Sequence, residues 1–93
     1  MTIQSFQCKD TEALFKNFRV KRFVNIESVA RRKLKAVDAA HELRDLAAPP
    51  GNRLEPLIGD RKGQHSIRIN DQWRVCFVWT ASGPADVEIT DYH

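Results

Sequence analysis

The sequence predicts one α+β domain over residues 1–93, with two N-terminal helices packed on a twisted, mostly antiparallel β-sheet. Three observations lead to this prediction. Apolar residues recur at helical spacing in the first half of the chain, and they alternate with polar residues in the second half. A Pro-Pro-Gly-Asn run at 49–52 separates the two patterns. The expected order of elements is β-α-α-β-β-β-β.

The composition is that of a folded protein of modest size, with 42% hydrophobic and 29% charged residues among 93. No apolar run reaches the roughly 18 residues of a membrane helix, and the N-terminus lacks a signal-peptide pattern. We therefore expect a cytoplasmic protein without membrane contact. Cys8 and Cys76 are too few for a disulfide framework or a zinc site, so we expect two small buried thiols, no metal and no cofactor.

Positive charge is concentrated in the first half of the chain. Residues 1–48 hold ten Lys and Arg against six Asp and Glu, whereas residues 49–93 hold five against six. Such a surplus indicates an anionic partner, either nucleic acid or an acidic protein.

The first half should hold one short strand and two helices. A strand is expected at 3–6, followed by a short helix that Asp10 caps. The main helix should run from Ile26 to about Ala47 with Asn25 as its N-cap, because this segment has no Gly or Pro. Its apolar stripe comprises Ile26, Val29, Ala30, Leu34, Val37 and Ala40, with Lys33 inside it, while Leu43 and Leu46 drift off it.

The second half should form the sheet. Strands are expected at 54–58, where Pro56 argues for an edge or a bulge, and at 65–69, 73–79 and 87–90. A basic loop at 59–63 joins the first two. Alternation in the third strand places Trp73, Val75, Phe77 and Trp79 on one face and Arg74, Cys76 and Val78 on the other.

Arg74 is the first candidate for chemistry, since an arginine among Trp, Val, Cys and Phe is costly to bury unless it is paired or faces a cleft. One interpretation is a structural ion pair with Asp91 or Glu88. The other is a guanidinium presented to a phosphate, whose geometry Arg matches well. Position alone leaves both interpretations open.

The terminal Asp91-Tyr92-His93 gathers groups that can transfer protons near neutral pH, although such a run is also typical of a frayed tail. His65, which opens a strand beside the basic loop, is a candidate for ligand contact. Neither His65 nor His41 has the spacing of a metal site.

Several segments together resemble the HigB-type toxins of the RelE/ParE superfamily, which belong to bacterial type II toxin–antitoxin modules. The matching segments are 51–54, 57–61, 63–77 and 87–93, with an opening Ile-x-Ser-Phe at 3–6. The Trp-Arg pair at 73–74 and the terminal Asp-Tyr-His are specific when they occur together. The resemblance covers essentially the whole chain and implies a compact fold of two helices on a twisted antiparallel sheet.

The resemblance also implies a function. It implies a ribosome-dependent endoribonuclease that cleaves mRNA in the A site, and we expect this cleavage to be metal-independent. It also implies a HigA-type helix-turn-helix antitoxin that represses the shared operon, and we expect the toxin to reach operator DNA only through this antitoxin. Arg74, Asp91, Tyr92 and His93 match the family's catalytic residues. Glu55 and Ile58 stand where some relatives have a histidine and a lysine. The expected RNA-binding residues are Arg53, Arg61, Lys62, His65 and Arg68.

Two other functions fit the same fold. A ParE-like protein would poison DNA gyrase by binding, without nuclease activity, and the proton-transfer groups at the C-terminus argue against it. A degenerate toxin would keep only the contact with the antitoxin, and cells that express it alone would grow normally.

Overall fold

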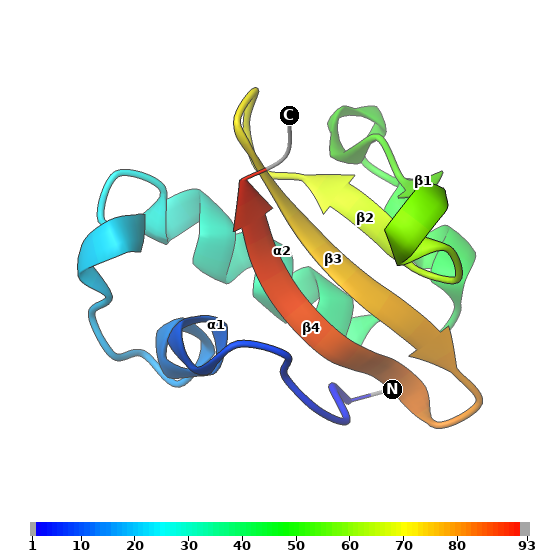
Figure 1. Cartoon of the computed structure of the whole chain (residues 1–93), viewed down its shortest axis with the longest axis horizontal. Coiled ribbons are helices and arrows are strands. Elements are labelled where there is room, and N and C mark those ends of the chain that lie inside the picture. Colours follow the sequence, from blue (N-terminus) through cyan, green and yellow to red (C-terminus); the bar gives the residue numbers. More distant parts are fainter. Residues whose placement is uncertain (1, 92–93) are drawn as a thin grey trace.

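A computed structural model describes residues 2–91 and shows two helices beside a curved four-stranded sheet (Figure 1). The helices are α1 (Lys9–Phe15) and α2 (Glu27–Ala39), and the strands are β1 (Glu55–Pro56), β2 (His65–Arg68), β3 (Trp73–Thr80) and β4 (Gly83–Asp91). The strands pair in the order β1-β2-β3-β4, and every pairing is antiparallel. Short 3-10 helices occupy the connections: η1 (Lys21–Phe23), η2 (Leu43–Ala47), η3 (Pro50–Asn52) and η4 (Gly59–Arg61). The α+β class and the antiparallel sheet are thus confirmed.

The N-terminal segment differs from the predicted strand. It is extended but forms only an isolated parallel bridge, between Phe6 and Val87. Its backbone bonds to β4 include Gln4 N to the Pro84 carbonyl at 2.7 Å and Val87 N to the Ser5 carbonyl at 3.1 Å. The segment is too short for a regular ladder, yet it covers the outer edge of β4 and so protects it from pairing with another chain.

The helix starts differ from prediction. Cys8, not Asp10, is the N-cap of α1, and Asp10 lies in the first turn, where its charge suits the helix dipole. Ile26, not Asn25, is the N-cap of α2, and its side chain makes no capping bond. The 3-10 helix at Lys21–Phe23 is followed by a turn at 24–26 that leads into α2, and the chain enters this helix without a polar cap.

The main helix is also shorter than predicted. It ends at Ala39, because Ala40 is extended, and the chain re-forms as the separate 3-10 helix η2. A capping box formed by Glu42 and Asp45 starts η2. Backbone amides of Glu42 and His41 donate to Asp45, and these bonds lower the pKa of its carboxyl group. The break turns Leu43 and Leu46 back toward the core, which explains why both drift off the helical stripe.

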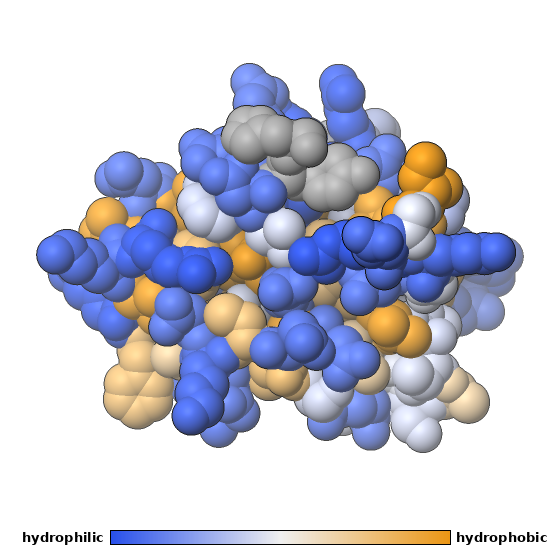
Figure 2. Space-filling view, viewed as in Figure 1, coloured by the Kyte–Doolittle hydropathy of each residue, from blue (hydrophilic) through white to orange (hydrophobic). Residues whose placement is uncertain are grey.

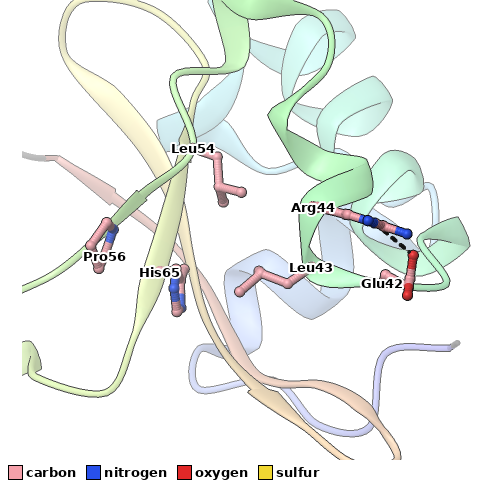
Figure 3. A pocket seen from close by; sticks show the side chains of 6 residues that line it. All are labelled: Glu42, Leu43, Arg44, Leu54, Pro56 and His65. Carbon is pink, nitrogen blue, oxygen red and sulfur yellow. Dashed lines mark hydrogen bonds and ion pairs between the residues drawn. The ribbon is translucent and has the colours of Figure 1, made fainter.

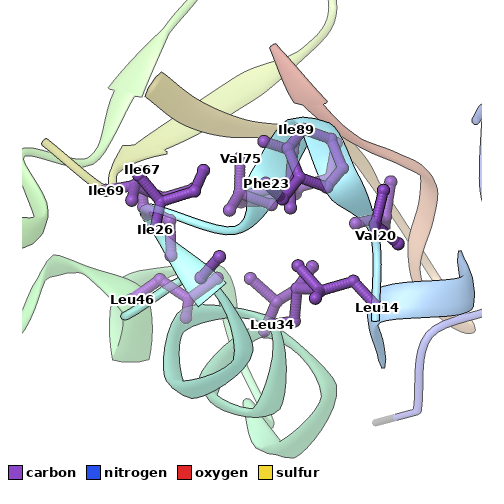
Figure 4. Close-up of a cluster of buried hydrophobic side chains, with 14 of the residues drawn as sticks. Leu14, Val20, Phe23, Ile26, Leu34, Leu46, Ile67, Ile69, Val75 and Ile89 are labelled. Atoms are coloured by element: carbon purple, nitrogen blue, oxygen red, sulfur yellow. The ribbon is translucent and has the colours of Figure 1, made fainter. Parts of the chain in front are cut away.

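The core lies between α2 and one face of the sheet (Figure 4). We call this the inner face; it is formed by Ile67, Ile69, Val75, Phe77, Val87 and Ile89, all buried. Ala30, Leu34 and Val37 of α2 pack against it and are fully buried. The alternation predicted for 73–79 is confirmed, since Trp73 and Trp79 also pack on this cluster. Within the described residues, no helix is long and apolar enough to cross a membrane.

A β-bulge interrupts the pairing of the two long strands. Cys76 lies opposite Glu88 and Val78 opposite Ala85, so two residues of β4 face the single residue Phe77. Asp86, in this bulge, has a positive φ of 52°. Ser5 holds it, since the Asp86 amide donates to the serine hydroxyl at 2.9 Å.

Candidate functional site

The face of the sheet away from α2 carries the candidate site. We call it the outer face, and it comprises Ser66 and Arg68 of β2, Arg74 and Cys76 of β3, and Glu88 and Thr90 of β4. Strand pairing makes them neighbours: Arg74 lies between Arg68 and Thr90, and Cys76 between Ser66 and Glu88. This side of the molecule is largely hydrophilic (Figure 2).

Arg74 is almost buried, with 9% of its surface exposed, and it is held on two sides. Its Nε donates to the Ser66 hydroxyl at 2.7 Å, and its Nη2 donates to the Arg53 carbonyl at 2.7 Å. Nη2 also lies 3.5 Å from a carboxylate oxygen of Glu55, which is half exposed. Within residues 2–91, the ion-pair partner of Arg74 is therefore Glu55 and not Asp91 or Glu88. Nη1 makes no hydrogen bond with the described residues.

Arg61 and Glu88 close part of the outer face. The Arg61 guanidinium bonds to Glu88 at 3.0 Å and to the Gln64 side chain at 3.0 Å, which ties the η4 loop to β4. Cys76 is fully buried nearby, and this burial raises the pKa of its thiol. The prediction of a buried thiol is confirmed for Cys76, while Cys8 is only partly buried.

A further cation, Lys33 of α2, was not assigned a functional role from the sequence. Its Nζ bonds to the side-chain oxygen of Asn52, a buried residue whose amide donates to the Leu46 and Ala48 carbonyls at 3.1 Å each. Desolvation lowers the pKa of Lys33, and the nearby charges of Arg32 and Arg68 lower it further. The sequence signal was its position inside the apolar stripe, which directs a lysine toward the sheet.

The C-terminal trio is described only at its first residue. Asp91 lies opposite Trp73 at the end of β4 and accepts a hydrogen bond from the Gln72 side chain at 3.0 Å. Strand alternation puts its side chain with Ile89, on the side opposite Arg74. Tyr92 and His93 lie outside the described residues.

The predicted RNA-binding residues are divided between the two faces. Arg68 lies beside Arg74 and pairs with Asp71, and Arg53, in the left-handed conformation with a φ of 46°, presents its carbonyl to Arg74. Lys62 is exposed at the end of η4. His65 does not join this group.

His65 lies toward the inner face, where its ring stacks on Phe77 with centroids 6.5 Å apart. It lines a hollow of about 570 Å³ with Leu43, Leu54 and Pro56, and the Glu42–Arg44 ion pair lies at the same hollow (Figure 3). Its Nδ1 is buried and has no hydrogen-bond partner among the described residues. In residues 2–91, no group of three His, Cys, Asp or Glu side chains is placed to hold a metal ion.

Comparison with known proteins identifies the family. The family described as "RelE-like toxin of type II toxin-antitoxin system HigB" matches residues 4–93. The chain belongs to the HigB-like toxin family. "Toxin HigB-1" of Vibrio cholerae serotype O1 is 42% identical over 76 residues, covering 80% of each chain. "Endoribonuclease HigB" of Proteus vulgaris is 33% identical over 93 residues, covering 98% of this chain and 99% of the relative.

A solved structure supports the fold of this HigB-like toxin. The "YoeB/ParE toxin from Agrobacterium tumefaciens" superposes with a TM-score of 0.57 over 100% of both chains, at 19% identity. At that identity the likeness concerns the fold alone. Membership of a type II toxin–antitoxin family implies an antitoxin partner for this chain.

Proposed function

We propose that this HigB-like toxin is an endoribonuclease that cleaves mRNA in the ribosomal A site. The observation that carries the proposal is the fixed guanidinium of Arg74, which lies on the outer face beside Arg68 with Nη1 unbonded among the described residues. The Proteus vulgaris relative named "Endoribonuclease HigB", which matches 98% of the chain, supports the same activity.

The chemistry would use the RNA's own 2′-hydroxyl as the nucleophile and need no metal ion. The 2′-oxygen bonds to phosphorus while the bond from phosphorus to the 5′-oxygen breaks, which leaves a 2′,3′-cyclic phosphate and a free 5′-hydroxyl. Arg74 would stabilise the extra negative charge on the five-coordinate phosphorus. The requirement for a 2′-hydroxyl would restrict cleavage to RNA.

Two protons must move in this reaction, one off the 2′-hydroxyl and one onto the 5′-oxygen. We assign these transfers to Tyr92 and His93, by resemblance to the family's C-terminal residues, with Asp91 orienting His93. Glu55 is the carboxylate that pairs with Arg74, at 3.5 Å. In the free protein the Glu55 carboxylate therefore partly neutralises the Arg74 guanidinium, to which the phosphate would bind.

The remaining predicted contacts hold the substrate and the ribosome. Arg53, Arg61, Lys62, His65 and Arg68 are proposed to contact mRNA and ribosomal RNA backbone. Arg61 would have to exchange its bond to Glu88 for one to phosphate. We further propose a HigA-type helix-turn-helix antitoxin as the partner, through which the toxin would reach operator DNA.

Primer extension on mRNA from cells expressing the toxin tests the proposal. The wild type should produce cuts in phase with codons. Arg74→Ala and His93→Gln should each remove them, with losses of about 100-fold or more for a group acting on the transition state. Arg74→Lys keeps the charge but not the fork, and should retain only a small part of the activity.

Arg74 also holds the η3 turn, so folding must be checked separately. Arg74→Ala leaves the Ser66 hydroxyl and the Arg53 carbonyl without their donor, which should cost about 1–3 kcal/mol of stability. Circular dichroism of each purified variant would show whether the fold persists. Codon-phased cuts that survive in a folded Arg74→Ala variant would refute the assignment. Growth arrest with gyrase inhibition and intact mRNA would favour a ParE-like function instead.

A further inference from the structure

We infer that Lys33 of α2 binds a backbone phosphate of RNA adjacent to the phosphate at Arg74, so that the RNA-binding surface extends from the sheet onto the helix. The inference rests on the proposed function, because it assumes that Arg74 engages the scissile phosphate. It adds a binding residue from an element outside the sheet.

One turn fixes both cations. Asn52 accepts a hydrogen bond from Lys33, and the next residue, Arg53, accepts one from Arg74. Asn52 is itself buried and anchored by two backbone carbonyls, and η3 packs against β2. Consecutive residues of a rigid turn therefore hold side chains that come from α2 and β3. Both cations are thus held against one turn, where one strand of RNA could contact both.

Arg68 connects the two positions electrostatically. It is the direct cross-strand neighbour of Arg74 on β2, and its charge is close enough to Lys33 to lower the pKa of that lysine. Arg32, exposed on α2, acts on Lys33 in the same way. We call these four cations the basic track: Arg74 and Arg68 lie on the outer face, and Lys33 and Arg32 lie on α2.

Lys33 differs from the other cations of this track in its partner. Arg74 lies against Glu55, and Arg68 pairs with Asp71, so a phosphate must compete with a carboxylate at both. Among the described residues Lys33 pairs with no carboxylate; its partner is the neutral amide of Asn52. Partial burial beside two cations makes its charge unfavourable in the free protein. A phosphate at Lys33 would therefore not have to displace a carboxylate of the described residues.

The test measures binding of the full-length toxin to a short fluorescent single-stranded RNA with 2′-fluoro riboses, which cannot be cleaved. Fluorescence anisotropy over a salt series gives the slope of log affinity against log salt. Loss of one phosphate contact should reduce the slope magnitude by about 0.7 in Lys33→Gln. Affinity at low salt should fall roughly tenfold, as for one charge-assisted hydrogen bond.

Lys35→Gln is the matched control, because Lys35 lies two residues further along α2, is exposed and forms no ion pair among the described residues. It removes the same charge and should stay within about twofold of the wild type. Lys33→Arg should retain most of the affinity. Lys33→Gln also removes the donor to the buried side-chain oxygen of Asn52, so circular dichroism and the melting temperature of each variant must show that the fold persists.

Several results would overturn the inference: equal losses in Lys33→Gln and Lys35→Gln, no change in Lys33→Gln, or no measurable RNA binding by the wild type. Weakened antitoxin binding with unchanged RNA binding would assign Lys33 to the protein partner instead. Failure of the proposed function gives a different pattern, in which mRNA from expressing cells is intact while the Lys33 effect on RNA binding persists.

Discussion

The two faces of the sheet are built from alternate residues of the same strands, yet they serve different purposes. The buried part of the inner face is apolar and packs on α2. The outer face is also substantially buried at Ser66, Arg74 and Cys76, but its cover consists of hydrogen-bonded turns and an ion pair. Apolar packing stabilises the fold without fixing a chemical group, whereas the polar cover holds a guanidinium in one orientation.

The largest expected difference between the faces is in stability. Phe77→Ala empties a fully buried position of the inner face and should cost about 3–5 kcal/mol. Cys76→Ala, at the neighbouring and equally buried position of the outer face, should cost about 1 kcal/mol. Urea denaturation followed by circular dichroism measures both. Similar losses for the two variants would show that both faces contribute equally to the core.

A smaller effect is expected on ligand binding at the outer face. Glu55→Gln removes the carboxylate beside Arg74. It should strengthen RNA binding about two- to fivefold, since Glu55 is half exposed and the pair is worth up to about 1 kcal/mol. Fluorescence anisotropy at low salt measures it. Asp60→Asn, an equal change of charge at an exposed site on η4, is the control. Weaker binding in Glu55→Gln would mean that this carboxylate helps to hold the RNA.

The smallest effect concerns the ion pair between Arg61 and Glu88, which covers part of the outer face. Arg61→Ala breaks the bond to Glu88 and should change stability by less than about 1 kcal/mol, but it should speed modification of Cys76 by a thiol reagent. Burial raises the pKa of Cys76, so its labelling in the wild type should require a higher pH than that of an ordinary thiol. Mass spectrometry can follow both cysteines, with Cys8 as the internal reference and Lys62→Ala as the control. Unchanged Cys76 labelling in Arg61→Ala would show that this bond does not protect the thiol.

The sequence predicted β2 and β3 well because alternation is a strong local signal. The ends of the other two strands were predicted wrongly, since β4 begins at Gly83 and not at 87, and β1 spans only Glu55–Pro56 and not 54–58. The pattern of 73–79 correctly separated Val75 and Phe77 from Arg74 and Cys76. The helix boundary was harder to predict, because nothing in 26–47 is a helix breaker. The drift of Leu43 and Leu46 off the apolar stripe was the available signal, together with the acidic pair that caps η2.

The candidate site was predictable only in part. Arg74 stands out in the sequence because it interrupts an apolar strand, but its partner Glu55 comes from another strand, and no local pattern indicates that contact. The same holds for Lys33, whose link to the site passes through Asn52 and depends on how the turn after η2 packs. The roles of Tyr92 and His93 remain predictions.

The bulge at Asp86 determines which residues near the C-terminus belong to which face. Because β4 contains one extra residue there, every position beyond it is out of phase with the first half of the strand. If the same residues instead alternated regularly through Asp86, without a bulge, Glu88 and Thr90 would point into the apolar core and Ile89 into the solvent. Asp86 has a positive φ and is held by Ser5, near the opposite end of the chain. This one residue thus determines which side chains of the last part of β4 face the core.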